Sequence, residues 1–361
     1  MGLAALAVWA EQTRLGKAVS APAIIIVVAM VGSTFGVLPA SAPLYDAVWT
    51  YAVPLSIALF LIKADLLDIA KRSGPMLAAF LVGTVGASIG ALLPAVLFDL
   101  GPDEAKLAGV FAATYTGGSL NFAGVAQAIG FDDPSKLSAA LAVDNVLGTA
   151  YILGANLLAG WSLFRSRFYW GSESICEQGE AAETTADDRQ PSLLDLVVSI
   201  ALAASVCAGS AAIARVFGFE SYALLFLTVL MVALATGLRQ HLRDLRGESV
   251  LAMGLMFLFF GVIGAGANLA DMATSAPTIF VLGLSIFIFH LIFLLGAARL
   301  FRWNYGIVIV SSLACIAGPP VAAAIAVLFG WRALVTPGIL TGVLGYVLGN
   351  FIGVGIYQLL A

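Results

Sequence analysis

A single acidic residue lies in the middle of a long apolar segment of this chain. Asp144 is followed at once by Asn145, inside an apolar stretch that runs from about 136 to 163. Because a charged side chain is costly inside a membrane, an acid at that depth is expected to serve a function. Carboxylate and amide oxygens bind Na⁺, and a buried carboxylate can also carry a proton. The pair therefore predicts a cation-coupling site for either Na⁺ or H⁺, with a purely structural carboxylate as the alternative.

Two short motifs break other apolar segments at positions 200 residues apart. Thr-Gly-Gly-Ser at 116–119 breaks the segment 105–129, and Ala-Gly-Pro-Pro at 317–320 breaks the segment 305–329. Glycine and proline at such points end one helix and begin another. Paired breaks at corresponding positions of two halves are the best sequence pointer to the binding site of a secondary transporter. Simple kinks without a ligand are the alternative.

The backbone at each break offers binding groups of both signs. A half-helix that begins at a break presents free N–H groups and a positive dipole end, which favour an anionic group. A half-helix that ends there presents free carbonyls, which favour a cation. Ser119 is expected to act as the N-cap of the helix that follows it. The predicted solute site consists of Gly117, Gly118, Ser119, Asn121, Ala317, Gly318 and Pro319.

Neutral oxygens near the breaks extend the predicted cation site. Its candidate residues are Thr114, Thr116, Asn121, Asp144, Asn145, Thr149, Ser311 and Ser312. Helix-to-helix hydrogen bonding is the alternative interpretation of the stripe that contains Asn145, Thr149 and Asn156. In the second half, Leu344 stands where the first half has Asp144, so only one strongly charged site is expected. We expect no cofactor, and no metal beyond a possible Na⁺ at Asp144.

Other features of the apolar segments have plainer explanations. Glycines recur in steps of three or four residues from Gly338 to Gly353, which predicts a face of close helix packing. Pro277 is expected to open the segment that precedes the second broken one. His290 is expected to be a buried, hydrogen-bonded histidine, with a proton relay as the alternative. No Ser-His or paired-Asp catalytic arrangement is visible, so we do not expect an enzyme.

Composition identifies a membrane protein. Apolar residues make up 61% of the chain and charged residues 11%, and no basic stripe for nucleic acid is present. The apolar segments repeat, so the predicted fold is an all-α polytopic membrane protein of two inverted repeats. Each repeat has five transmembrane helices plus one broken, re-entrant segment. The predicted domains are repeat one (1–163), a polar cytoplasmic linker (164–192) and repeat two (193–361).

Twelve apolar segments can be placed along the chain. Segment 3–18 is short and contains Glu11, so the sequence does not decide whether it spans the membrane. The segments are 3–18, 20–38, 44–62, 76–99, 105–129 and 136–163 in repeat one, and 193–216, 221–238, 249–267, 277–300, 305–329 and 333–360 in repeat two.

The distribution of basic residues favours re-entrant broken segments. If every segment crossed the membrane, the 17 Lys and Arg would divide almost evenly between the two faces. If the broken segments enter and leave on the same face, 14 of the 17 fall on one face and only Lys106, Lys136 and Arg215 on the other. The positive-inside rule makes the basic face cytoplasmic. We therefore expect a multi-pass protein of the bacterial inner (plasma) membrane, with the linker and basic loops in the cytoplasm.

Several motifs together resemble a known family. They are Thr116–Phe122, Asp144-Asn145, Gly318–Pro320 with the following alanines, and Pro337–Tyr346. From about residue 18 onward the chain resembles the bacterial "domain of unknown function 819" membrane proteins. More distantly it resembles the cation–proton antiporter and anion transporter superfamily, which includes sodium–glutamate and sodium–bile-acid symporters. That resemblance implies an elevator-like carrier with core and scaffold domains, often a homodimer. Antiporters of that superfamily carry an acidic pair or Asn-Asp pair at this place, whereas the order here is Asp144-Asn145.

These observations lead to one principal functional hypothesis and two alternatives. The principal one is a Na⁺- or H⁺-coupled secondary transporter of a small organic solute, either an organic anion or an amino acid. A cation–proton antiporter without organic substrate is the first alternative, and a channel or membrane receptor is the second. The expected partners are membrane lipid, a small-molecule solute and a second copy of the chain, and no nucleic acid.

Overall fold

The computed structural model describes residues 21–97, 101–161 and 190–361, together with residues 2, 5, 6 and 9. Most of the predicted segment 3–18 and nearly all of the linker 164–192 lie outside these residues. The described parts of the chain are helical and contain no strand. Their elements are α2 (Ala21–Thr34), α3 (Pro43–Ala47), the π-helix η2 (Val48–Ala52), α4 (Val53–Leu61), α5 (Leu66–Arg72), α6 (Gly74–Leu97), α7 (Glu104–Gly117), α8 (Leu120–Ala128), α9 (Pro134–Gly160), α12 (Leu193–Val216), η3 (Glu220–Tyr222), α13 (Ala223–Gly237), α14 (Arg239–Leu242), α15 (Glu248–Gly266), α16 (Leu269–Phe301), α17 (Tyr305–Ile316), α18 (Pro319–Leu328) and α19 (Arg332–Leu360).

Eight helical stretches among the described residues are long and apolar enough to cross a membrane. They agree with eight of the ten predicted crossings, those from 44 to 99, from 136 to 163, from 193 to 300 and from 333 to 360. The segment predicted at 20–38 contains only the 14-residue helix α2, which is shorter than a perpendicular span needs. The all-helical membrane fold is therefore confirmed.

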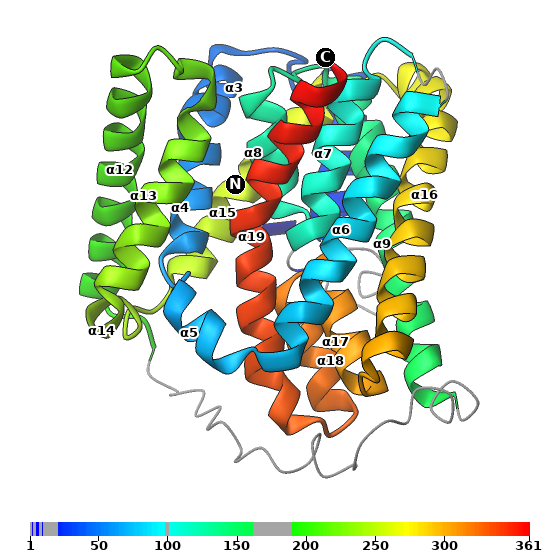
Figure 1. Cartoon of the computed structure of the whole chain (residues 1–361). Coiled ribbons are helices and arrows are strands. Elements are labelled where there is room, and N and C mark those ends of the chain that lie inside the picture. The colour runs from blue at the N-terminus through cyan, green and yellow to red at the C-terminus, as the bar shows by residue number, and fades with distance from the viewer. Residues whose placement is uncertain (1, 3–4, 7–8, 10–20, 98–100, 162–189) are drawn as a thin grey trace.

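Both predicted helix breaks are present. The segment 105–129 consists of α7 and α8, and the segment 305–329 consists of α17 and α18. Each piece has 9 to 14 residues, which is too short to cross a bilayer alone. In Figure 1, α7 and α8 lie in the upper half of the molecule and α17 and α18 in the lower half.

One predicted boundary is wrong. Pro277 does not open its segment but lies inside α16, which begins at Leu269. Proline removes one N–H donor, and a long buried helix tolerates that loss where neighbouring groups compensate. Pro94 in α6 and Pro337 in α19 show that this chain repeatedly accommodates proline within helices, so proline alone does not mark a boundary here.

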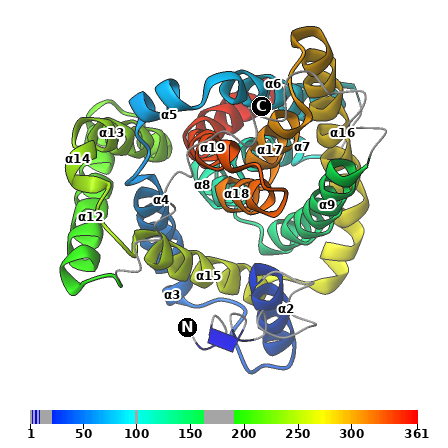
Figure 2. The same cartoon turned by 90° about the horizontal axis from the view of Figure 1, so that it is seen from below.

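The broken helices occupy the middle of the bundle. Figure 2 shows α7, α8, α17, α18 and α19 gathered together, with α9, α6 and α16 on one side and α4, α12, α13 and α15 on the other. Helix α19 joins the two broken segments, because its glycine face packs against both. A Cβ on Gly353 would lie 2.6 Å from the carbonyl oxygen of Gly109 in α7, and one on Gly342 would lie 2.7 Å from the backbone nitrogen of Pro319 in α18. The predicted close-packing face is therefore confirmed.

Candidate functional site at the paired helix breaks

The first break depends on one glycine. Helix α7 ends at Gly117, and Gly118 follows with φ 99° and ψ 174° before α8 starts at Leu120. Only glycine adopts this backbone conformation without strain. Its N–H still donates to the carbonyl of Thr114 at 2.6 Å, which closes the last turn of α7.

The second break repeats this conformation. Helix α17 ends at Ile316, Gly318 has φ 84° and ψ −178°, and Pro319 opens α18. Proline fits the first turn of a helix because its missing N–H would have had no intrahelical partner there. The same backbone geometry at positions 200 residues apart is consistent with a duplicated structural unit.

The two breaks touch. A Cβ on Gly118 would lie 3.5 Å from the carbonyl carbon of Ala317, and one on Gly318 would lie 3.1 Å from the carbonyl oxygen of Gly117. Beside them, the Sγ of Cys315 donates to the carbonyl of Tyr115 at 3.1 Å. Tyr115 has non-helical dihedral angles (φ −90°, ψ 16°), which turn its carbonyl away from the helix ladder. The expectation that Gly118 and Gly318 meet is confirmed.

Asp144 reaches the first break from α9. The Ser119 hydroxyl donates to Oδ2 of Asp144 at 2.8 Å, and Asp144 itself is only 7% exposed. The hydroxyl of Tyr115 lies close to the same carboxylate but makes no hydrogen bond of regular geometry. A buried carboxylate therefore faces the point where the chain is unwound, and among the described residues Ser119 is its one donor of regular geometry.

The expectation that Ser119 caps α8 is wrong. Ser119 occupies the position before the helix, but its side chain makes no capping hydrogen bond. Its backbone is in the right-handed helical region (φ −64°, ψ −6°), whereas a capping residue is usually extended. The hydroxyl proton goes to Asp144 instead. The first N–H groups of α8 are consequently left without a side-chain cap, which suits a site for an external anionic group.

Asn121 is a structural link across the site. Its amide nitrogen donates to the carbonyl of Ala113 at 3.2 Å and to the carbonyl of Gly345 at 2.9 Å. These bonds tie α8 to α7 and to α19, and the side chain is 3% exposed. Its position next to the break agrees with the sequence prediction, and its amide protons are already engaged.

The other predicted cation ligands differ in burial and in their hydrogen bonds. Thr114, Thr116 and Ser311 are buried and donate their hydroxyl protons to carbonyls of their own helices, which leaves the oxygens as acceptors. Asn145 is half-buried and donates to the carbonyl of Leu141 at 2.8 Å. Thr149 is exposed on α9, so the structure does not bring it into the site.

Ser312 belongs to a buried network that the sequence did not predict. The carbonyl of Gly83 lies 2.9 Å from Nδ1 of His290, the Ser312 hydroxyl lies 2.8 Å from Nε2, and the Tyr151 hydroxyl lies 2.5 Å from that of Ser312. A carbonyl only accepts, so Nδ1 carries the proton. In a neutral ring Nε2 then accepts from Ser312, and Ser312 accepts from Tyr151. Gly83 makes room for this ring, because a Cβ there would lie 2.7 Å from Cε1 of His290.

Few charged side chains are available near the breaks to bind a cation. In the part of the chain that the structure describes, no group of three His, Cys, Asp or Glu side chains is close enough to hold a metal ion. The donor set at the breaks is one carboxylate with hydroxyl and carbonyl oxygens. Such a set matches the preference of a hard monovalent cation or a proton rather than a transition metal.

Comparisons with known proteins show the family of this chain. The family model described as "Protein of unknown function (DUF819)" matches residues 1–361. The chain belongs to the DUF819 family. It is also 32% identical over 374 residues to "Uncharacterized membrane protein YjcL" of Bacillus subtilis (strain 168), covering 96% of this chain and 93% of that protein. The resemblance expected from the break motifs is confirmed for the family, and this DUF819 chain is a membrane protein.

Proposed function

We propose that this DUF819 protein is a cation-coupled secondary transporter of a small organic solute. The observation that carries the proposal is the contact between two unwound helix breaks beside a buried carboxylate. Unwound backbone in a membrane must be buried in protein or line a wet cavity, because lipid cannot satisfy its polar groups. Transporters use such breaks to bind substrate and coupling ion.

Each element at the breaks has a role in this proposal. The N-termini of α8 and α18 bind an anionic group of the solute through their positive dipole ends and the N–H of Ser119. Gly118 and Gly318 supply the conformation of the breaks rather than donors, because their N–H groups donate to carbonyls of the preceding helices, and Pro319 has no N–H. Asp144 neutralises Na⁺ or carries H⁺, assisted by oxygens of Thr116 and Ser119. The solute is an organic anion or an amino acid, which both supply the anionic group. No other cofactor takes part.

The proposed mechanism is elevator-like alternating access by two inverted repeats. Helices α7 and α8 lie in one half of the molecule and α17 and α18 in the other, as expected if the two broken segments enter from opposite faces (Figure 1). The central helices with α6, α9 and α16 would move as a core against a scaffold that contains α12 and α13, in a homodimer. The protein would lie in the bacterial inner membrane with the linker in the cytoplasm.

A cation–proton antiporter without organic substrate is the second candidate. The observation that favours it is the one carboxylate at the breaks, Asp144, because a carboxylate that binds a proton and a metal ion in turn is sufficient for antiport. The two functions differ in what they need: antiport needs only ions, whereas symport shows no coupled flux until the solute is present.

Purified protein in proteoliposomes tests the proposal. Uptake of labelled amino acids and carboxylates should rise when an inward Na⁺ or H⁺ gradient is imposed, and Asp144→Asn should abolish the dependence on the gradient. Proton flux driven by Na⁺ or K⁺ alone, reported by a pH-sensitive dye, would support the antiporter. No Asp144-dependent flux of either kind would refute both.

A further inference from the structure

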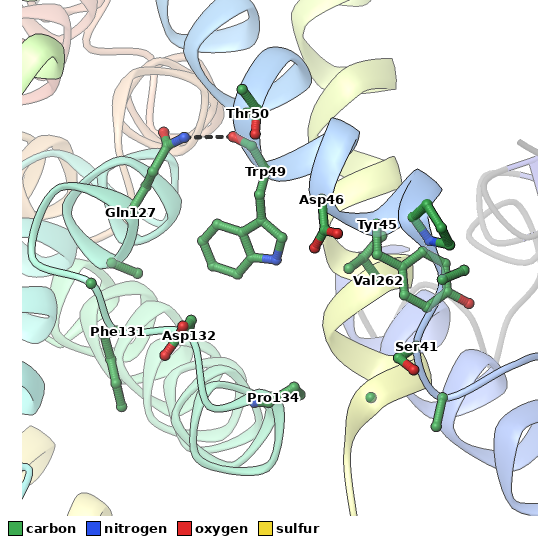
Figure 3. Close-up of a pocket in the computed structure, with 16 residues that line it drawn as sticks. Ser41, Tyr45, Asp46, Trp49, Thr50, Gln127, Phe131, Asp132, Pro134 and Val262 are labelled. Atoms are coloured by element: carbon green, nitrogen blue, oxygen red, sulfur yellow. Dashed lines mark hydrogen bonds between the residues drawn. The ribbon is translucent and has the colours of Figure 1, made fainter. Parts of the chain in front are cut away.

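A cleft of about 670 Å³ opens between the α2–α3 loop with α3 and η2 on one side and the α8–α9 loop on the other. We call it the acidic cleft and define it by Tyr45, Asp46, Trp49, Gln127, Asp132 and Pro134 (Figure 3). It is separate from the helix breaks but connected to them through α8. The nine residues of α8 span about 14 Å from the first break to the cleft.

The charge of the cleft is negative. Asp46 and Asp132 line it from opposite sides, and none of its lining residues is Lys, Arg or His. Both side chains are exposed, and neither has an ion-pair partner in the described residues. A site with unpaired carboxylates raises the local concentration of cations and disfavours anions.

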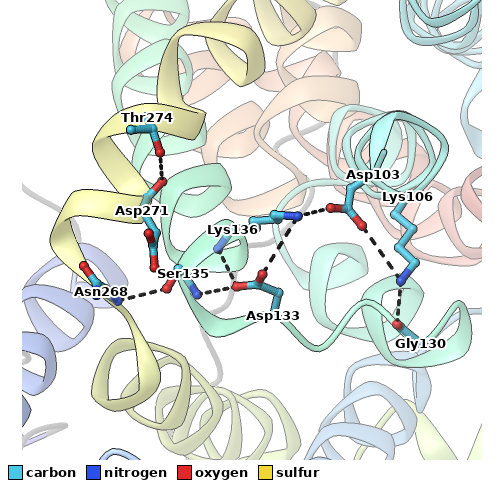
Figure 4. A network of polar contacts seen from close by, with 9 residues as sticks. All are labelled: Asp103, Lys106, Gly130, Asp133, Ser135, Lys136, Asn268, Asp271 and Thr274. Atoms are coloured by element: carbon cyan, nitrogen blue, oxygen red, sulfur yellow. Dashed lines mark hydrogen bonds and ion pairs between the residues drawn. The ribbon is translucent and has the colours of Figure 1, made fainter. Parts of the chain in front are cut away.

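The nearby basic residues do not cancel this charge. Figure 4 shows Lys136 paired with Asp103 and with Asp133, whose Oδ2 lies 3.9 Å from its Nζ. Lys106 lies 4.0 Å from Asp103 and donates to the carbonyl of Gly130 at 3.2 Å. These two lysines thus pair with Asp103 and Asp133, so no basic residue in the described ranges compensates Asp46 or Asp132.

The aromatic wall of the cleft comes from an irregular helix. Trp49 and Thr50 belong to the π-helix η2, and π-helical turns occur frequently at functional sites. The carbonyl of Trp49 accepts a hydrogen bond from Gln127 across the cleft, and its ring meets Phe259 edge-on at 4.9 Å between centroids. In Figure 3 the indole ring lies between Asp46 and Asp132. A fixed indole face beside carboxylates is the arrangement that binds an ammonium group.

We propose that the acidic cleft binds the ammonium group of an organic amine. The chemistry comes from Trp49, which offers its ring face, and from Asp46 and Asp132, which offer counter-charge. Because both carboxylates are exposed to water, the affinity should be weak, with a Kd on the order of millimolar. If the protein is the proposed transporter, the cleft is the entrance of the transport pathway and favours an amino acid over a simple organic anion. This role in transport rests on the proposed function. As a binding site it stands independently of transport.

Three probes of one chain length test the proposal in detergent solution without any gradient. These are n-butylammonium chloride, sodium butyrate and 1-butanol, each titrated at constant ionic strength while tryptophan fluorescence is recorded. Butylammonium should give a saturable change that butyrate and butanol do not give. The change should disappear in Trp49→Phe, which assigns it among the six tryptophans. The apparent Kd should rise about tenfold in Asp46→Asn/Asp132→Asn.

Asp244→Asn is the matched control, because Asp244 is an exposed carboxylate in an ion pair with its neighbour Arg243. It should bind butylammonium as the wild type does. If the double variant does not fold, the single variants Asp46→Asn and Asp132→Asn replace it. An equal response to butyrate, an unchanged Kd in the aspartate variants or no saturable response to butylammonium overturns the proposal. A transport failure with intact butylammonium binding refutes only the proposed function.

Discussion

Ser119 and Asp144, 25 residues apart at the start of α8 and within α9, share a hydrogen bond of 2.8 Å at the first helix break. The bond engages the serine that the sequence predicted as the cap of α8. It also fixes Asp144, the only ionisable side chain predicted for the cation site, beside the unwound backbone. A change in the charge of Asp144 therefore acts on the side chain of Ser119, next to the N-terminus of α8 where the solute is proposed to bind.

Ser119→Ala should weaken cation coupling without abolishing it. The substitution removes one donor to a buried carboxylate, and a hydrogen bond to a charged group is worth about 1.5–3 kcal/mol. The half-saturating Na⁺ or H⁺ concentration for uptake should therefore change by about tenfold or more. Ser56→Ala is the matched control, since the buried Ser56 hydroxyl bonds only to the carbonyl of Val53 in its own helix. Equal effects of the two substitutions would contradict a special role for Ser119.

Gly118→Ala and Gly318→Ala should each destabilise the protein and impair transport. Both glycines have positive φ, and a side chain there costs about 1–3 kcal/mol. Gly148→Ala is the control, because a Cβ on Gly148 in α9 would meet no other group within 4 Å and alanine favours a helix. Thermal unfolding in detergent measures the difference. Unfolding temperatures that match that of the wild type at both breaks would contradict the assigned backbone conformation.

Ser312→Ala should destabilise the protein more than Ser311→Ala. Removal of the Ser312 hydroxyl leaves Nε2 of His290 and the hydroxyl of Tyr151 without their partner, at a cost of about 1–3 kcal/mol for each buried group. Ser311 bonds only to the carbonyl of Val308 in its own helix, so its loss leaves no side chain unpaired. Chemical denaturation of the two variants compares adjacent positions on α17. An equal loss in the free energy of unfolding for the two variants would show that the His290 network adds no stability.

Asp132→Cys and Arg332→Cys should react with a membrane-impermeant maleimide from opposite faces of the membrane. The two residues are exposed, follow α8 and α18 respectively, and lie 200 positions apart in the repeat. Inverted repeats require their equivalent loops to face opposite compartments. In a background without the three original cysteines, intact cells should label Asp132→Cys only. Labelling of both from one face would refute the inverted arrangement.

The sequence predicted the positions of the helix breaks because glycine and proline act locally. Gly118 and Gly318 permit a positive φ that other residues adopt only with strain, and so their spacing was sufficient to place two half-helices in each segment. Pro277 shows the limit of this reasoning, because whether proline ends a helix or is accommodated within it depends on neighbouring helices.

The partners of the polar side chains were not predictable in the same way. Ser119 has the sequence position of a cap, yet tertiary packing brings Asp144 within reach of its hydroxyl. Tyr151 and Cys315 contact groups 161 and 200 residues away, and no spacing within one helix encodes such contacts. The acidic cleft likewise joins loops from distant parts of the chain, so only the folded structure reveals it.

The central claim is that ion gradients drive solute movement through a site controlled by Asp144. Its most direct test compares wild type and Asp144→Asn in proteoliposomes, with uptake of labelled amino acids and organic anions measured under an inward Na⁺ or H⁺ gradient and with no gradient. We expect wild-type uptake of at least one solute to exceed its no-gradient level, and Asp144→Asn to show no such increase. Gradient-driven uptake that is equal in the two proteins would contradict the account.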